Sequence, residues 1–180
     1  MQMNYYIADL HLGDQRVFDL CRRNISIEDY NQKLISNWNA KVKDDDHVWI
    51  IGDFCKFDYL ANALEVLHQL NGHHHLVFGN HDEEMLEIYG FEGFYENFDS
   101  VYQLTLIDDN NREVFLCHYP MLDWWNSQYG SYHIYGHIHN KDLPEIKAYY
   151  KDKLAFNASA DVIDHTPMTL DELIKLKEMM

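Results

Sequence analysis

The stretch Leu76-Val77-Phe78-Gly79-Asn80-His81-Asp82 joins a short apolar run to an amide, an imidazole and a carboxylate. An apolar run that ends at a glycine is typical of a buried β-strand followed by a sharp turn. The polar side chains then stand beyond the carboxyl end of the strand, which is where open α/β sheets bind their ligands. Residues 76–82 therefore predict a strand with a cluster of metal-binding side chains at its end.

The same combination of apolar run and polar cluster occurs four more times along the chain. Because the carboxyl ends of neighbouring strands meet at one edge of a sheet, we expect the five clusters to share one site. The other four clusters are Asp9-Leu10-His11, Gly52-Asp53, His118 and Gly136-His137-Ile138-His139.

The spacing within the clusters suits metal binding. Residues i and i+2 of an extended chain point to the same side, so Asp9 can reach one site together with His11, and His137 together with His139. Mixed carboxylate, imidazole and amide ligands favour Mn, Fe or Zn over Ca, and this many ligands favours two ions over one. A glycine precedes the ligands in three clusters, where the backbone must pass close to its neighbours: Gly52, Gly79 and Gly136.

Each cluster taken alone has a more ordinary explanation. Asp-x-His and Gly-Asp are common at strand ends and in turns, and a single histidine such as His118 is more often part of a core than a ligand. His73-His74-His75 also invites a metal interpretation, but it has no carboxylate at a useful spacing. We expect a polar turn there, with His75 packed beneath the site. All five clusters in this order, each after a strand, favour a metal site.

The intervening segments predict an α/β fold. Further strands are expected at 5–8, 48–51, 132–135 and 154–156, and a hairpin of 101–107 and 112–117 around the turn Asp108-Asp109-Asn110-Asn111. Apolar residues recur at helical spacing behind a capping box of Ser26 and Asp29, as far as Val42. Further helices are expected at 59–70, as a short segment from Asp82, and at 170–177 with Thr169 as cap.

Length, charge and cysteine content limit the kind of protein. The 180 residues suit one domain, 1–180, and no apolar run approaches the roughly 20 residues that span a bilayer. The net charge of −16 argues against tight, nonspecific binding to duplex DNA. The three scattered cysteines and the lack of a signal-peptide pattern at the N-terminus favour a cytoplasmic location.

Taken together, Asp-x-His, Gly-Asp, Gly-Asn-His-Asp, His and Gly-His-x-His in this order resemble the calcineurin-like metallophosphoesterase superfamily. The resemblance covers nearly the whole chain and is greatest to the short bacterial and phage-encoded members, which share features such as Asp9-Leu10-His11-Leu12-Gly13 and His118-Tyr119-Pro120-Met121. It implies a four-layer α-β-β-α sandwich, with two divalent metal ions at one edge of the sheets. Mn is favoured, with Fe, Zn, Ni or Mg as alternatives.

The resemblance also implies a role for each residue of the clusters. Asp53 would bridge the two metals, and His81 would face the substrate, where it stabilises the phosphate or protonates the leaving oxygen. The first metal would be held by Asp9, His11, Asp53 and His139, and the second by Asp53, Asn80, His118 and His137.

The implied reaction is hydrolysis of a phosphate ester by a hydroxide that bridges the metals. We expect a phosphodiester substrate that is small or nucleotide-like, no stable nucleic-acid complex, no membrane association, and a monomer or homodimer. The alternatives are a phosphomonoesterase, a nuclease, and a non-catalytic scaffold that kept only the fold. Candidate substrate contacts are Asn80, His81, Arg23, Tyr119 and Trp125, although the aromatic residues could equally belong to a core or a dimer contact.

One position departs from the pattern of the larger relatives. They carry Gly-Asp-x-x-Asp, in which the second Asp orients the catalytic histidine, whereas this chain has Lys56 there. The partner that orients His81 is therefore open, with Asp14 and Asp58 as candidates.

Overall fold

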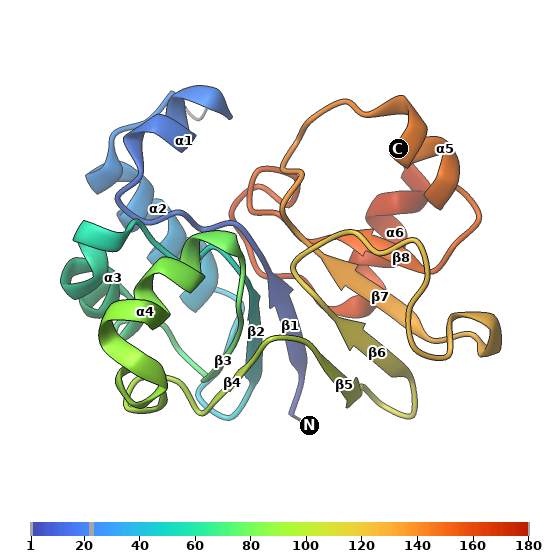
Figure 1. The fold of residues 1–180 in the computed structure, drawn as a ribbon, viewed down its shortest axis with the longest axis horizontal. Helices are drawn as coiled ribbons and strands as arrows, with labels where there is room; N and C mark the ends of the chain where they lie inside the picture. Colours follow the sequence, from blue (N-terminus) through green and yellow to red (C-terminus); the bar gives the residue numbers. More distant parts are fainter. Residues whose placement is uncertain (1, 22–23, 180) are drawn as a thin grey trace.

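The computed structural model describes residues 2–21 and 24–179, which form two four-stranded β-sheets between layers of helices (Figure 1). The first sheet has the order β1-β2-β3-β4 and is entirely parallel. The second has the order β5-β6-β7-β8, in which only the β5–β6 pair is antiparallel. The strands are β1 Asn4–Ile7, β2 His47–Ile51, β3 His73–Val77, β4 Ser100–Tyr102, β5 Thr105–Asp108, β6 Glu113–Leu116, β7 Tyr132–Tyr135 and β8 Ala155–Asn157.

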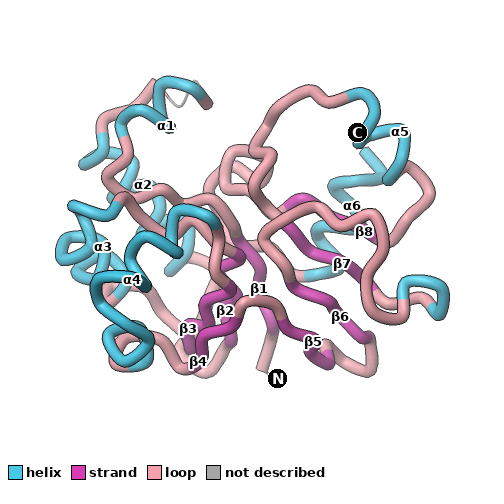
Figure 2. The backbone as a smooth tube through the Cα atoms, in the orientation of Figure 1, coloured by secondary structure: helices cyan, strands magenta, loops and turns pink. Residues whose placement is uncertain are grey.

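Helices cover the outer face of each sheet, which confirms the expected α-β-β-α layers (Figure 2). Four helices lie beside the first sheet: α1 Gln15–Leu20, α2 Ile27–Asn39, α3 Leu60–Leu67 and α4 Asn80–Tyr95. Helices α5 Pro144–Tyr150 and α6 Leu170–Met179 lie beside the second, and short 3-10 turns occur at Phe57–Tyr59 and Ser127–Tyr129. None of the helices in the described ranges is both long and apolar enough to cross a membrane.

Ser26 caps α2 as expected, but the helix ends at Asn39, before Val42. The Ser26 hydroxyl accepts a hydrogen bond from the Asp29 amide at 3.1 Å and so starts α2. The helix then buries Tyr30, Leu34 and Trp38 completely against the first sheet. The Trp38 indole donates to the backbone oxygen of Asn71, which satisfies the one polar group of that buried ring. This bond fixes the helix to the loop that precedes β3.

The expected strand at 101–107 is in fact two strands in different sheets. Val101 pairs with Leu76 in the first sheet, whereas Thr105 pairs with Leu116 in the second. The chain therefore crosses between the sheets at residues 103–104. The predicted hairpin is confirmed for β5 and β6, and its turn is closed by hydrogen bonds between the backbones of Asp109 and Arg112.

The prediction of a polar turn at His73-His74-His75 is wrong, because these residues form the first part of β3. Cross-strand contacts override the polar sequence: the ring of His75 stacks on Trp49 with centroids 4.3 Å apart, and its Nε2 lies 2.6 Å from His47 Nδ1. His75 also does not lie beneath the predicted site, which follows the opposite end of the strand. The helix from Asn80 is longer than expected and has a non-helical residue at Gly90.

Candidate metal centre

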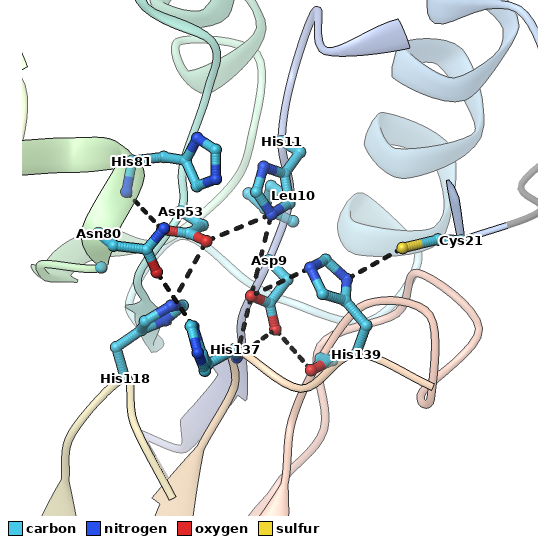
Figure 3. Close-up of polar contacts among 12 residues, drawn as sticks. Asp9, Leu10, His11, Cys21, Asp53, Asn80, His81, His118, His137 and His139 are labelled. Atoms are coloured by element: carbon cyan, nitrogen blue, oxygen red, sulfur yellow. Dashed lines mark hydrogen bonds and ion pairs between the residues drawn. The ribbon is translucent and has the colours of Figure 1, made fainter. Parts of the chain in front are cut away.

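The five predicted clusters meet where β1, β2, β3, β6 and β7 end (Figure 3). Asp53 lies at the centre. Its Oδ2 is 3.3 Å from His11 Nε2 and 3.4 Å from His118 Nε2. One carboxylate oxygen therefore faces two imidazole nitrogens from two different strands.

Asp9 and two histidines line one side of this centre. The Oδ1 of Asp9 is 3.8 Å from His139 Nε2 and 4.0 Å from His11 Nε2, and the rings of His11 and His139 stack 5.0 Å apart. All three residues are buried, and their ligand atoms are close enough to share one metal ion.

The other side is formed by Asn80 and two further histidines. Asn80 Oδ1 is 3.0 Å from His137 Nδ1, and the His137 ring lies 5.2 Å from that of His118. Asp9, Asp53 and His118 form a second group whose ligand atoms could hold a metal. The structure thus brings together all of the residues that the sequence suggested as ligands.

The buried nitrogens of this cluster provide a test of whether a metal fits. Among the described residues, His11 Nε2 and His118 Nε2 are buried and have no hydrogen bond of ordinary geometry. His118 Nδ1 faces the Ile51 carbonyl at 2.9 Å and can donate to it, so in the neutral ring Nε2 is the nitrogen that offers a lone pair to a metal beside Asp53. A buried polar atom without a partner costs about 1–3 kcal/mol. A bound cation would satisfy both nitrogens, so the donor set fits a transition metal.

The backbone of the ligand residues is unusual. Five of them have a left-handed backbone, with φ of 58° at Asp9, 46° at His11, 56° at Asp53, 68° at His137 and 52° at His139. Non-glycine residues adopt this conformation rarely, at a cost of roughly 1–3 kcal/mol each, and such residues cluster at functional sites. Asp9 and His11 therefore reach the same site through a turn, and not through the extended backbone that the i and i+2 spacing suggested.

The glycines of the clusters permit the close approach of these turns. A Cβ on Gly52 would lie 2.3 Å from His118 Nδ1, and one on Gly79 would lie 2.3 Å from Asp53 Oδ1. A Cβ on Gly136 would lie 2.6 Å from Ala8 Cβ and from Asp9 Oδ2. Any larger residue would push a ligand out of place.

Burial and nearby charges shift the pKa values of the residues in this centre. Burial lowers the pKa of His118, but the Asp53 carboxylate outweighs burial and raises this pKa to about 9. Burial raises the pKa of Asp53, but the imidazoles of His11 and His118 outweigh it and hold that pKa well below its usual range. Burial dominates at His11 and lowers its pKa. Asp53 is therefore a buried anion, to which a cation binds favourably.

His81 lies at the edge of this centre. Its backbone amide donates to Asp53 Oδ1 at 2.9 Å, and its ring contacts His11 edge to face at 4.9 Å. Ligand atoms of His11, Asp14 and His81 lie within 4.8 Å of one another. The carboxylate of Asp58 instead pairs with Lys56 on the surface. Of the two candidate partners of His81, Asp14 is the one beside it.

The candidate substrate contacts differ in their positions. The ring of Tyr119 lies 4.8 Å from that of His137, and Tyr119 is 40% exposed, so it borders the centre. Trp125 is 64% exposed in the loop after β6. Trp124 belongs to a small core with Phe115 and Tyr135. Arg23 lies outside the described residues.

Sequence reasoning gave no role to two groups of residues that hold the ligands. The buried carboxylate of Asp82 accepts hydrogen bonds from the amides of Gly79, Asp53 and Phe54 at 2.7–2.9 Å, and so joins two of the loops. The segment after β8 reaches Asp9 and His139 through Ser159 and Asp161. Two sequence signals could have indicated these residues. Asp82 lies inside the Gly-Asn-His-Asp motif, and Ser159 and Asp161 belong to a sixth polar segment that follows a strand.

Comparison with known proteins agrees with this geometry. Residues 4–158 match the model of the calcineurin-like phosphoesterase superfamily domain. The chain belongs to this superfamily. Its members are metal-dependent phosphoesterases, and membership supports phosphoester hydrolysis with divalent metals in general.

Similar proteins come from several sources. The uncharacterized protein MJ1445 of Methanocaldococcus jannaschii is 31% identical over 180 residues, which are 99% of this chain and 93% of that protein. The Gene 66 protein of Mycobacterium phage L5 is 30% identical over 84 residues, which are 46% of this chain and 41% of that protein. The crystal structure of a protein of unknown function, AQ665 from Aquifex aeolicus, has the same fold, with a TM-score of 0.74, 24% identity and coverage of 98% of this chain and all of that one.

Proposed function

We propose that this protein is a dinuclear-metal-dependent phosphodiesterase that acts on a small or nucleotide-like substrate. One observation carries the proposal: a buried carboxylate, Asp53, faces nitrogens of His11 and His118 that have no hydrogen bond of ordinary geometry among the described residues. Family membership supports the reaction class.

The ligands divide into two sets that share Asp53. Asp9, His11 and His139 would hold one metal, because their ligand atoms lie close together, and Asn80, His118 and His137 would hold the other (Figure 3). The Asp9 carboxylate also lies close enough to Asp53 and His118 to share an ion with them. The mixture of nitrogen and oxygen ligands favours Mn, with Fe, Zn, Ni or Mg as alternatives. Bound metals would stabilise charge on the phosphoryl oxygens and activate the attacking water.

His81 is the proposed acid that assists the leaving group. Its ring stands over His11 at the edge of the centre and is only partly buried, so a substrate can reach it. Asp14 is the proposed partner that orients it, in place of the Asp that larger relatives carry where this chain has Lys56. Asp14 comes from the loop after β1, so the same function would be supplied from a different strand.

The surroundings of the centre favour a small diester. The net charge of −16 disfavours a long polyanion, which argues against the nuclease alternative. The exposed ring of Tyr119 beside His137 offers a face on which an aryl group or a nucleobase could stack. Trp125 and Arg23 remain proposed contacts, as do a cytoplasmic location and a monomeric or homodimeric state.

Two alternatives remain within the same fold. A phosphomonoesterase would use the same ligands and differ only in the substrate. A non-catalytic scaffold would be expected to lose ligands or His81, and this chain keeps them all.

The test is hydrolysis after metal reconstitution. The protein is stripped with a chelator, Mn, Mg, Zn or Ni is added, and cleavage of an aryl phosphodiester is compared with that of an aryl phosphomonoester. We expect Mn-dependent turnover with the diester preferred, and loss of turnover in Asn80→Ala. A preference for the monoester would support the phosphomonoesterase, and stoichiometric metal binding without turnover on either ester would support the scaffold.

A further inference from the structure

The last residue of β8 and the segment that follows it place polar side chains at alternate positions beside the candidate metal centre. These are Asn157, Ser159 and Asp161. Two backbone hydrogen bonds with Ala8 fix the segment: the Ala8 amide donates to the Ala158 oxygen and the Ala160 amide donates to the Ala8 oxygen, each at 2.8 Å. Its side chains are therefore presented from a rigid support at the end of β1.

Ser159 holds the carboxylate of Asp9. Its hydroxyl donates to Asp9 Oδ2 at 2.5 Å, and both residues are completely buried. The backbone amide of His137 lies 3.0 Å from both oxygens of the same carboxylate. Donors on these oxygens limit the rotation of the side chain and direct Asp9 Oδ1 toward His11 and His139.

Asp161 holds the ring of His139. Its Oδ2 lies 2.7 Å from His139 Nδ1, whereas the Cys21 sulfur lies 3.3 Å from the same nitrogen. One nitrogen carries at most one proton, and the shorter contact with a charged acceptor favours donation to Asp161. The proton then resides on Nδ1, and Nε2 is left with a lone pair that faces the centre. Asn157 also donates to the backbone oxygen of His139 at 2.9 Å.

We propose that Ser159 and Asp161 are positioning residues that preorganise Asp9 and His139 and thereby set the affinity of one of the two metal sites. The inference rests on the proposed function. The hydrogen bonds just described go to ligands of the Asp9 side, while on the other side His118 is held by the Ile51 carbonyl. The side chains of Ser159 and Asp161 therefore support ligands of the Asp9 side, while the His137 amide on Asp9 connects the two sides. Both positions lie beyond residue 158, where the match to the family model ends.

The experiment measures Mn binding by calorimetry on the chelator-treated, full-length protein, so that it requires no turnover. Loss of a partner of this kind typically weakens metal binding about 10–100-fold. We expect Asp161→Asn and Ser159→Ala each to weaken one of two Mn equivalents to that degree and to leave the other unchanged. Asp164→Asn, an exposed position of the same segment whose carboxylate pairs with Lys33, is the matched control and should bind as the wild type.

Two results would overturn the inference. One is wild-type affinity for both equivalents in both variants. The other is a fall in the melting temperature of metal-free Asp161→Asn well below that of Asp164→Asn, which would make Asp161 a structural residue only. Two Mn equivalents in the wild type without any ester hydrolysis would instead refute the proposed function, while a selective loss in Asp161→Asn would still support the positioning role.

Discussion

At the scale of single residues, Asp53 connects all parts of the candidate centre. It faces His11 and His118 through one oxygen and receives the amide of His81 on the other. Replacement of Asp53 by Asn keeps the shape and the acceptor for that amide but removes the charge. We expect Asp53→Asn to lose binding of both Mn equivalents, as measured by elemental analysis after dialysis. Retention of two equivalents would contradict a bridging role.

His81 should affect the reaction and not metal binding. Removal of a proton donor typically slows turnover about 10²–10⁴-fold. We therefore expect His81→Ala to keep both metals and to lose kcat within this range on the aryl diester. His68→Ala, an exposed histidine after α3, is the control and should be fully active. A His81→Ala protein with wild-type kcat would remove His81 from the mechanism.

Asp14 offers a sharp test of how His81 is oriented. Its Oδ1 also caps α1 by accepting from the amides of Arg16 and Val17. Asn caps a helix as well as Asp does, so Asp14→Asn should keep the fold and lose only the charge beside His81. We expect kcat to fall about 10-fold or more, with KM and metal content unchanged. Asp58→Asn on the surface should have no effect, and equal kcat in the two variants would exclude Asp14 as the partner.

At the scale of secondary-structure elements, the cap of α2 can be tested directly. Loss of the hydroxyl of an N-cap residue costs about 0.5–2 kcal/mol. Ser26→Ala should therefore lower the free energy of unfolding of the metal-free protein by about 1 kcal/mol in urea denaturation. Ser36→Ala, at an exposed position in the last turn of the same helix, is the control, and should be neutral or slightly stabilising because Ala is the better helix former. An equal loss of unfolding free energy in both variants would show that the Ser26 hydroxyl does not stabilise the start of α2.

Elements with a regular hydrophobic pattern were predictable from the sequence, and those decided by distant contacts were not. The strands β1, β2 and β7 and the helix α2 follow local apolar periodicity. The His73-His74-His75 segment becomes a strand because Trp49 and His47 of the neighbouring strand pack against it. The division of 101–107 between two sheets likewise depends on which partners the chain meets after Tyr102.

The candidate site was also predictable where it depends on local sequence, and not where it depends on distant contacts. Ligand-type side chains after each strand could be identified because a strand end is a local feature. The support from Asp82, Ser159 and Asp161 could not, since each acts on residues that lie far away in the sequence or across a turn. The left-handed backbone of five ligand residues was also not visible, because it arises from closure of the loops around the centre.

At the scale of the whole molecule, bound metal should stabilise the fold. The centre joins strand ends from both sheets, and a ligand that binds only the folded state contributes about 2.7 kcal/mol at 100 times its Kd. We expect Mn to raise the melting temperature of the chelator-treated protein, as followed by calorimetry. Asp53→Asn should lack this increase, and an equal increase in that variant would indicate Mn binding elsewhere on the acidic surface.

The most direct test of the dinuclear centre is a crystal structure of the Mn-loaded protein with anomalous diffraction data. We predict two anomalous peaks on opposite sides of Asp53. One should contact Asp9, His11 and His139, and the other Asn80, His118 and His137. A single peak, or peaks that do not share Asp53, would contradict the account.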